Sequence, residues 1–144
     1  MHSADDAFQQ FLEAYRDAAL AKDADAFVRP YADDLHVFDM WDAWSLRGIA
    51  AWRRMAEGWF GSLDDERVQD AFDDVNSYVG ADMVCGHPRV TYTALAADGT
   101  RLRSLSNRMT VVLRWRDDAW KVVHEHTSAP IEHTTLKARL QPGA

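Results

Sequence analysis

Residues 108–130 read RMTVVLRWRDDAWKVVHEHTSAP, and this stretch decides the fold. Two runs of alternating apolar and polar residues flank Asp117 and Asp118, a residue pair that favours a two-residue turn. Such a pattern predicts an antiparallel hairpin, because each run can turn one apolar face toward a core. The short turn also sets the register of the two strands, so it predicts which side chains share a face.

Counting back from this turn gives the pairs expected on the apolar face. They are Trp115 with Trp120, Leu113 with Val122, Val111 with His124, Met109 with His126, and Asn107 with Ser128. A second turn at residues 98–99 extends the same face to Leu105, Tyr92 and Val90. This face should look toward the helices, since that is where a sheet face loses water. The two histidines are therefore expected as polar groups within an apolar wall.

Length, charge and cysteine content limit the class of protein. The chain has 144 residues, enough for one domain, and a formal net charge of −7 without a Lys/Arg stripe, which argues against a nucleic-acid partner. Cys85 is the only cysteine, so no intramolecular disulfide can form. The first twenty residues are amphipathic and acidic, unlike a secretory signal, and no run reaches the eighteen apolar residues of a membrane span. We expect a soluble, cytoplasmic protein with no membrane partner.

The remaining patterns predict helices first and strands later. Apolar residues at helical spacing indicate helices at about residues 5–21, 24–30 and 48–61, and a short alternating strand is expected at 35–39. Strand-like runs with turn signals follow from about residue 68, which predicts a four-stranded meander. This order is typical of an α+β domain with helices over one face of a mostly antiparallel sheet. We expect a single domain over residues 1–144 with a core at about 6–132, and a tail at 136–144 that frays.

This order of elements, ending in WKVVHEHTSAP, resembles the nuclear transport factor two-like superfamily over residues 6–132. Within it the chain is most similar to SnoaL-like domains and to the association domain of calcium/calmodulin-dependent protein kinase. The resemblance implies a cone-shaped α+β fold of the cystatin-like or ketosteroid-isomerase-like kind, in which three N-terminal helices close over a curved sheet and leave a pocket. It also implies a homodimer formed through the convex sheet face.

Ketosteroid isomerases share this fold, and two of their chemical positions have counterparts here. Their helix tyrosine is followed eight positions later by an aspartate, a pattern that Tyr15 and Asp23 reproduce. Their base aspartate follows an Ala-Asp-Asp run like residues 32–34, which points to Asp39. The resemblance does not extend to their third position, a neutral acid on a central strand, because residues 101–116 contain no acid.

Three residues are candidates for catalysis, and each has a structural alternative. Asp39 would be a general base, because a carboxylate beside large apolar side chains loses water and its pKa rises; alternatively it is a loop aspartate facing solvent. Tyr15 would donate a hydrogen bond to an enolate or carbonyl oxygen, or it is a core tyrosine. His124 would transfer a proton or orient a ligand; alternatively it is a histidine of the pocket wall whose ring forms a hydrogen bond with a neighbouring residue.

The rest of the expected pocket wall is mostly apolar, and its ligand-binding residues are Trp41, Trp44, Tyr92, Asn107, Met109, Val111 and His126. No metal site or cofactor is expected, since no third ligand converges with the two histidines. These residues favour binding of a small hydrophobic or carbonyl-bearing molecule, with acid–base chemistry of an isomerase, cyclase or dehydratase kind. The alternatives are a non-catalytic carrier or sensor, and an oligomerisation domain like the kinase hub.

Overall fold

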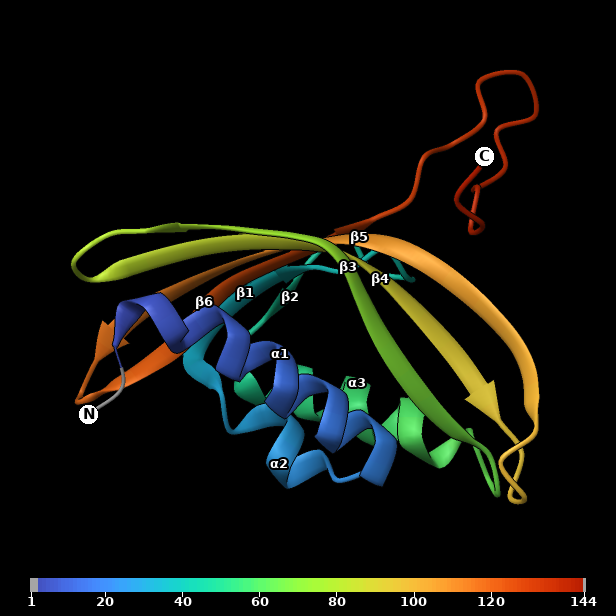
Figure 1. Ribbon diagram of the computed structural model, residues 1–144, viewed down its shortest axis with the longest axis horizontal. Coiled ribbons are helices and arrows are strands. Elements are labelled where there is room, and N and C mark those ends of the chain that lie inside the picture. The colour runs from blue at the N-terminus through green and yellow to red at the C-terminus, as the bar shows by residue number, and fades with distance from the viewer. Residues whose placement is uncertain (1–2, 144) are drawn as a thin grey trace.

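One curved sheet of six strands arches over three helices in the computed structural model, which describes residues 3–143 (Figure 1). The elements in chain order are α1 (Ala4–Ala21), α2 (Ala24–Val28), β1 (Tyr31–Phe38), β2 (Leu46–Arg47), α3 (Ile49–Gly61), β3 (Arg67–Val79), β4 (Met83–Leu95), β5 (Arg101–Arg116) and β6 (Ala119–Ser128). The sheet order is β2-β1-β6-β5-β4-β3, and every neighbouring pair is antiparallel except β1 and β6. The predicted α+β fold with three helices and a four-stranded meander is confirmed.

Local sequence signals explain where the helices begin and how α1 lies on the sheet. The side chain of Asp23 accepts a hydrogen bond from the Ala26 backbone N–H and so caps α2. Gly48 precedes α3 with a φ of 85°, a conformation that favours glycine. Gly86 on β4 lets α1 approach closely, because a Cβ atom there would lie 2.5 Å from the ring of Phe8.

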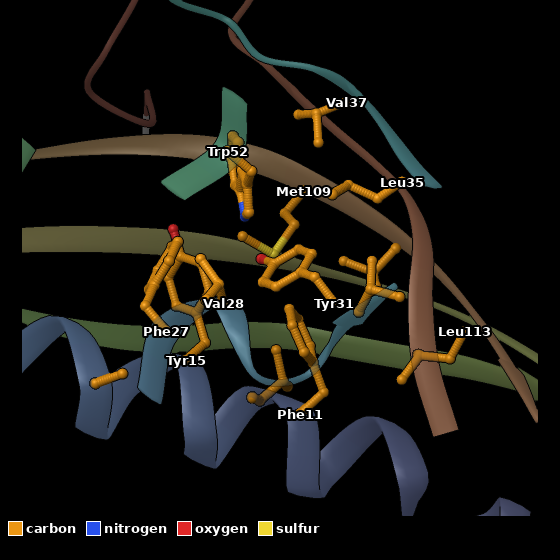
Figure 2. Packing of buried hydrophobic residues seen from close by; sticks show 14 of the residues in the cluster. Phe11, Tyr15, Phe27, Val28, Tyr31, Leu35, Val37, Trp52, Met109 and Leu113 are labelled. Atoms are coloured by element: carbon orange, nitrogen blue, oxygen red, sulfur yellow. The ribbon is translucent and has the colours of Figure 1, made fainter. Parts of the chain in front are cut away.

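Aromatic side chains fill the space between the helices and the concave face of the sheet (Figure 2). Phe27 of α2 lies at the centre, with its ring centroid 5.0 Å from that of Tyr15, 6.0 Å from that of Tyr31 and 6.0 Å from that of Trp52. Met109 reaches this layer from β5. The core is therefore built around large rings contributed by all three helices and β1.

The hairpin of β5 and β6 begins as predicted. Asp117 and Asp118 both have positive φ angles, of 52° and 62°, as a tight type I′ turn requires. Trp115 pairs with Trp120 in the register expected from that turn. The first part of the hairpin and its turn are confirmed.

A β-bulge then changes the register. Leu113 pairs with Val122, but the next residue of β5, Val112, pairs with His124, which leaves Val123 as an extra residue in β6. Because side chains alternate along a strand, one extra residue moves every later side chain of β6 to the other face.

The pairs predicted beyond this bulge are therefore wrong. Val111 lies opposite Glu125 instead of His124, and Met109 lies opposite Thr127 instead of His126. Asn107 has no partner in β6, whose last residue, Ser128, pairs with Arg108. The physical reason is the extra residue. The turn sets only the register of the pairs next to it, so it does not predict a bulge further along the strand.

The C-terminal tail folds back on β5 instead of fraying along its whole length. Ile131 and Ala138 form an isolated bridge, the Ser106 N–H donates to the Leu140 carbonyl at 2.7 Å, and Gln141 Nε2 donates to the Ser104 carbonyl at 2.6 Å. The last residue of the predicted frayed segment lies outside the described residues. Within residues 3–143, none of the helices combines the length and apolar character that crossing a membrane would require.

Candidate functional site

A pocket of about 500 Å³ opens between α3, the loop after β1 and the concave face of the sheet. Its apolar lining is contributed by Trp41, Trp52, Met55, Trp59, Leu63, Val68 and Leu105. The polar groups among its lining residues include Tyr15, Asp39, Asn107, Glu125 and Thr127. Large rings around a few convergent polar groups are typical of a small-molecule site.

Asp39 lines this pocket, directly after β1, and is half-buried. The Thr127 hydroxyl donates to Asp39 Oδ1 at 3.0 Å, and the Met40 backbone N–H donates to the Thr127 oxygen at 2.9 Å. Burial raises the pKa of Asp39 and the nearby charge of Asp42 adds to this, while the Thr127 hydrogen bond opposes it. The carboxylate is thus held in one orientation, and its pKa is moved toward neutrality.

Two tyrosines and an amide form a second polar group in the wall. The hydroxyls of Tyr15 and Tyr92 lie 3.0 Å apart, and Asn107 Nδ2 lies 3.5 Å from the Tyr92 oxygen. Burial raises the pKa of both Tyr15 and Tyr92 well above the usual value, so both keep their protons at neutral pH. Asn107 Oδ1 is buried and has no hydrogen-bond partner among the described residues. This group can donate and accept hydrogen bonds without being charged.

Glu125 is a pocket residue that the sequence analysis missed. It is only 1% exposed, and the Tyr31 hydroxyl donates to its Oε1 at 2.5 Å. Burial raises the pKa of Glu125 to about 8, and the charge of Asp39 acts in the same direction, while the Tyr31 hydrogen bond opposes it. The prediction placed Glu125 on the opposite face of β6, and nothing in the strand sequence marks the bulge that turns it inward.

A second buried acid, Asp70, was also missed. It lies on β3 directly opposite Tyr92 and is 3% exposed, and neither of its carboxylate oxygens has a partner among residues 3–143. Burial raises the pKa of Asp70 well above its usual value. Asp70 lies two residues after Val68 in a strand whose first residues alternate between exposed and buried. This spacing is the signal that could have identified Asp70 as buried.

His124 and His126 lie outside the pocket, contrary to the prediction. His124 Nδ1 lies 2.7 Å from the His36 carbonyl oxygen, and because a carbonyl only accepts, Nδ1 carries the hydrogen. The rings of His36, His124 and His126 gather around Phe38, with centroids 4.7, 5.1 and 5.4 Å from its centroid. The bulge in β6 places both histidines on the face opposite Glu125.

The other predicted site residues divide into two groups. The pocket lining includes Tyr15, Asp39, Trp41, Tyr92 and Asn107, as predicted.

The second group of predicted residues does not line this pocket. Met109 and Val111 face the helices as predicted, but they are fully buried in the core and do not line this pocket. Trp44 is 97% exposed and lies with His126 beside a separate hollow after β1. Among residues 3–143, no three His, Cys, Asp or Glu side chains converge as metal ligands would.

Comparison with known proteins agrees with this fold. Residues 6–132 match the SnoaL-like domain family. No curated protein matches the sequence. Three solved structures give the same overall arrangement at low sequence identity, which shows the fold alone.

The first is an NTF2-like protein of unknown function from Pseudomonas putida KT2440, with 24% identity, full coverage of both chains and a TM-score of 0.84. An NTF2-like protein with a cystatin-like fold from Novosphingobium aromaticivorans has 15% identity over 92% of this chain and 86% of that one, with a TM-score of 0.77. A protein from Xanthomonas campestris, provisionally described as a calcium/calmodulin-dependent protein kinase II association domain, has 15% identity over 87% and 86%, with a TM-score of 0.73. The predicted superfamily is confirmed.

Proposed function

The chain belongs to the SnoaL-like domain family, and from that premise we propose that it binds a small, largely apolar, carbonyl-bearing molecule and moves a proton at the carbon beside the carbonyl. Asp39 is the base, and Tyr15 donates a hydrogen bond to the oxygen. The observation that carries the proposal is that Asp39, oriented by Thr127, lines the same pocket as the Tyr15 hydroxyl. His124 has no part in it, because it lies outside the pocket.

The chemistry follows from the states of these groups. The Asp39 carboxylate takes the proton as the C–H bond breaks, and the electron pair moves onto the carbonyl oxygen to give an enolate. Tyr15 stabilises the new charge, because its hydroxyl remains protonated and its side chain is buried, where a hydrogen bond to a charge is stronger than in water. Tyr92, 3.0 Å from Tyr15, holds that hydroxyl in place. Protonated Asp39 then returns the proton to the same or a neighbouring carbon, which restores the carboxylate.

The apolar lining supports this choice of ligand. Indole rings of Trp41, Trp52 and Trp59 line the pocket and can contact a flat ring system. Arg103 also lines the pocket, but its guanidinium pairs with Glu66, with Nη2 2.6 Å from Oε1. Among the described residues, the wall therefore offers no unpaired cation to hold an anionic ligand, and an uncharged molecule fits it better.

Hydrogen exchange tests the proposal. We expect the wild-type protein to accelerate exchange of the hydrogens beside the carbonyl of α-tetralone in heavy water, followed by NMR. Asp39→Asn should abolish the acceleration, and Tyr15→Phe should reduce it by roughly 10²-fold. Asp33→Asn is the control, since Asp33 is an exposed aspartate of β1 that does not line the pocket.

The outcomes separate the alternatives. Exchange that is as fast with Asp39→Asn as with the wild type would contradict the assignment of the base. Binding of the ketone without any exchange by the wild type would favour a carrier or sensor over an enzyme.

We also propose a homodimer formed through the convex sheet face. Phe38 is 38% exposed on that face beside the rings of His124 and His126, so self-association would cover a large apolar ring. Glu125 does not contribute a negative charge to that face, because it is buried and lines the pocket. Light scattering should give about twice the 16.4 kDa of one chain. A much larger mass would favour an assembly domain like the kinase hub.

A further inference from the structure

Glu125 is the least exposed of the residues that line the pocket, at 1%. β6 is a central strand, and Glu125 pairs across it with Val37 of β1 and Val111 of β5, both of which are fully buried. The side chain still lines the pocket. The bulge at Val123 is what turns this acid inward, so the strand distortion and the buried acid belong to one arrangement.

No cation neutralises this carboxyl group. Within residues 3–143, no Lys, Arg or His side chain forms an ion pair with Glu125. Its one hydrogen bond comes from the neutral hydroxyl of Tyr31. An isolated buried carboxylate is costly and is relieved by taking up a proton. The pKa of about 8 agrees with a group that is mostly protonated at neutral pH.

A protonated carboxyl has one O–H group to donate. Glu125 Oε1 already accepts from Tyr31, so the second oxygen is the natural place for the proton. The described residues give this carboxyl no other hydrogen bond. The donor is therefore available to a molecule in the pocket.

We propose that Glu125 carries a proton and donates a hydrogen bond to an acceptor oxygen of the ligand, so that the pocket selects molecules that bring such an oxygen to its innermost part. The inference rests on the proposed function only in taking this pocket as the ligand site. It concerns recognition, and it holds whether or not a proton is moved at carbon.

Binding of prodan, an uncharged fluorescent naphthalene that carries a ketone, tests the proposal. Its emission responds to hydrogen bonding at the ketone, so one titration reports both affinity and the bond. For the wild type we expect constant affinity from about pH 6 to 7.5 and a fall above pH 8 of up to about tenfold per pH unit, as the donor is lost. Glu125→Gln keeps an N–H donor of similar shape, so it should bind with an affinity that does not change over this range.

Two further variants isolate the effect. Glu125→Leu removes the donor, so below about pH 7.5 it should bind about tenfold more weakly than the wild type, with a blue shift of the bound emission and an affinity that does not change with pH. Asp39→Asn should keep a fall in affinity, because it leaves Glu125 in place, but the fall should move to lower pH, because the charge of Asp39 contributes to the raised pKa of Glu125. A fall of the same size in Glu125→Gln, or no fall in the wild type, would overturn the proposal.

A ligand-free measurement keeps the inference testable if prodan does not bind. Carbon-13 NMR of the side-chain carboxyls should show one of the five glutamates titrating near the pKa of 8, and that signal should be absent from Glu125→Gln. Titration of all glutamates near their ordinary value would overturn the proposal. Absence of hydrogen exchange in α-tetralone would count against the proposed function but leave both of these measurements unaffected.

Discussion

A buried glutamate that holds its proton should make the fold less stable as pH rises. The pKa of Glu125 is about 8 in the folded protein, compared with 4.5 for an ordinary glutamate. Between these values the folded chain keeps a proton that the unfolded chain has lost, so the free energy of unfolding decreases with increasing pH. The stabilisation is fully present below about pH 4.5 and is lost as pH rises through 8.

The variant Glu125→Gln isolates this contribution. A pKa raised from 4.5 to about 8 corresponds to about 5 kcal/mol at roughly 1.36 kcal/mol per unit. Because glutamine does not titrate, the stability of the variant relative to the wild type should improve by about that amount between pH 4.5 and 8. Urea unfolding followed by tryptophan fluorescence at several pH values measures the difference.

A control shows that the effect belongs to the buried group. Glu57→Gln removes a glutamate from the exposed side of α3, and it should leave the pH dependence of unfolding as in the wild type. If the difference in stability between Glu125→Gln and the wild type stayed constant from about pH 4.5 to 8, the reasoning about burial and protonation would be refuted.

Three further comparisons test the packing, the strand register and the second buried acid. Gly86→Ala places a Cβ atom 2.5 Å from the Phe8 ring and should lower the free energy of unfolding in urea by about 1–3 kcal/mol. Gly58→Ala, with open space around it in α3, should raise the free energy of unfolding by about 0.5–1 kcal/mol. Equal effects of the two substitutions would contradict the close approach of α1. Deleting Val123 removes the bulge, so it should destabilise the sheet and abolish prodan binding, and a variant that binds normally would argue against the register described. Asp70→Asn removes a buried acid whose pKa is raised, so relative to the wild type its stability should improve as pH rises above the ordinary aspartate range; a difference independent of pH would show that this carboxyl is not buried.

Much of the fold follows from local sequence patterns. The turn at Asp117 and Asp118 and the first pairs of the hairpin depend only on adjacent residues, and the structure has them as predicted. Near the second turn, Tyr92 pairs with Leu105 on the expected face, although the register shifts between Ala94 and Leu95, closer to the turn. Tyr15 could be placed toward the sheet because helical spacing puts it on the apolar stripe of α1.

The innermost part of the site could not be predicted in this way. The alternation of side chains along β6 predicts which face each one occupies only where the strand has no extra residue. The extra residue is a valine, Val123, and not a glycine or proline that would indicate a bulge. The bond between Tyr31 and Glu125 joins residues 94 positions apart, so it depends on the parallel pairing of β1 with β6. Local sequence patterns do not predict the pairing of β1 with β6.

A crystal structure with a bound aromatic ketone would show which face of the sheet holds the ligand and which groups contact its oxygen. We predict density in the pocket under α3, with the ketone oxygen within about 3 Å of the Tyr15 hydroxyl or of Glu125, and with the carbon beside the carbonyl next to Asp39. A ketone bound on the opposite face beside His124 and His126, or a pocket filled by its own tryptophan side chains, would contradict this prediction.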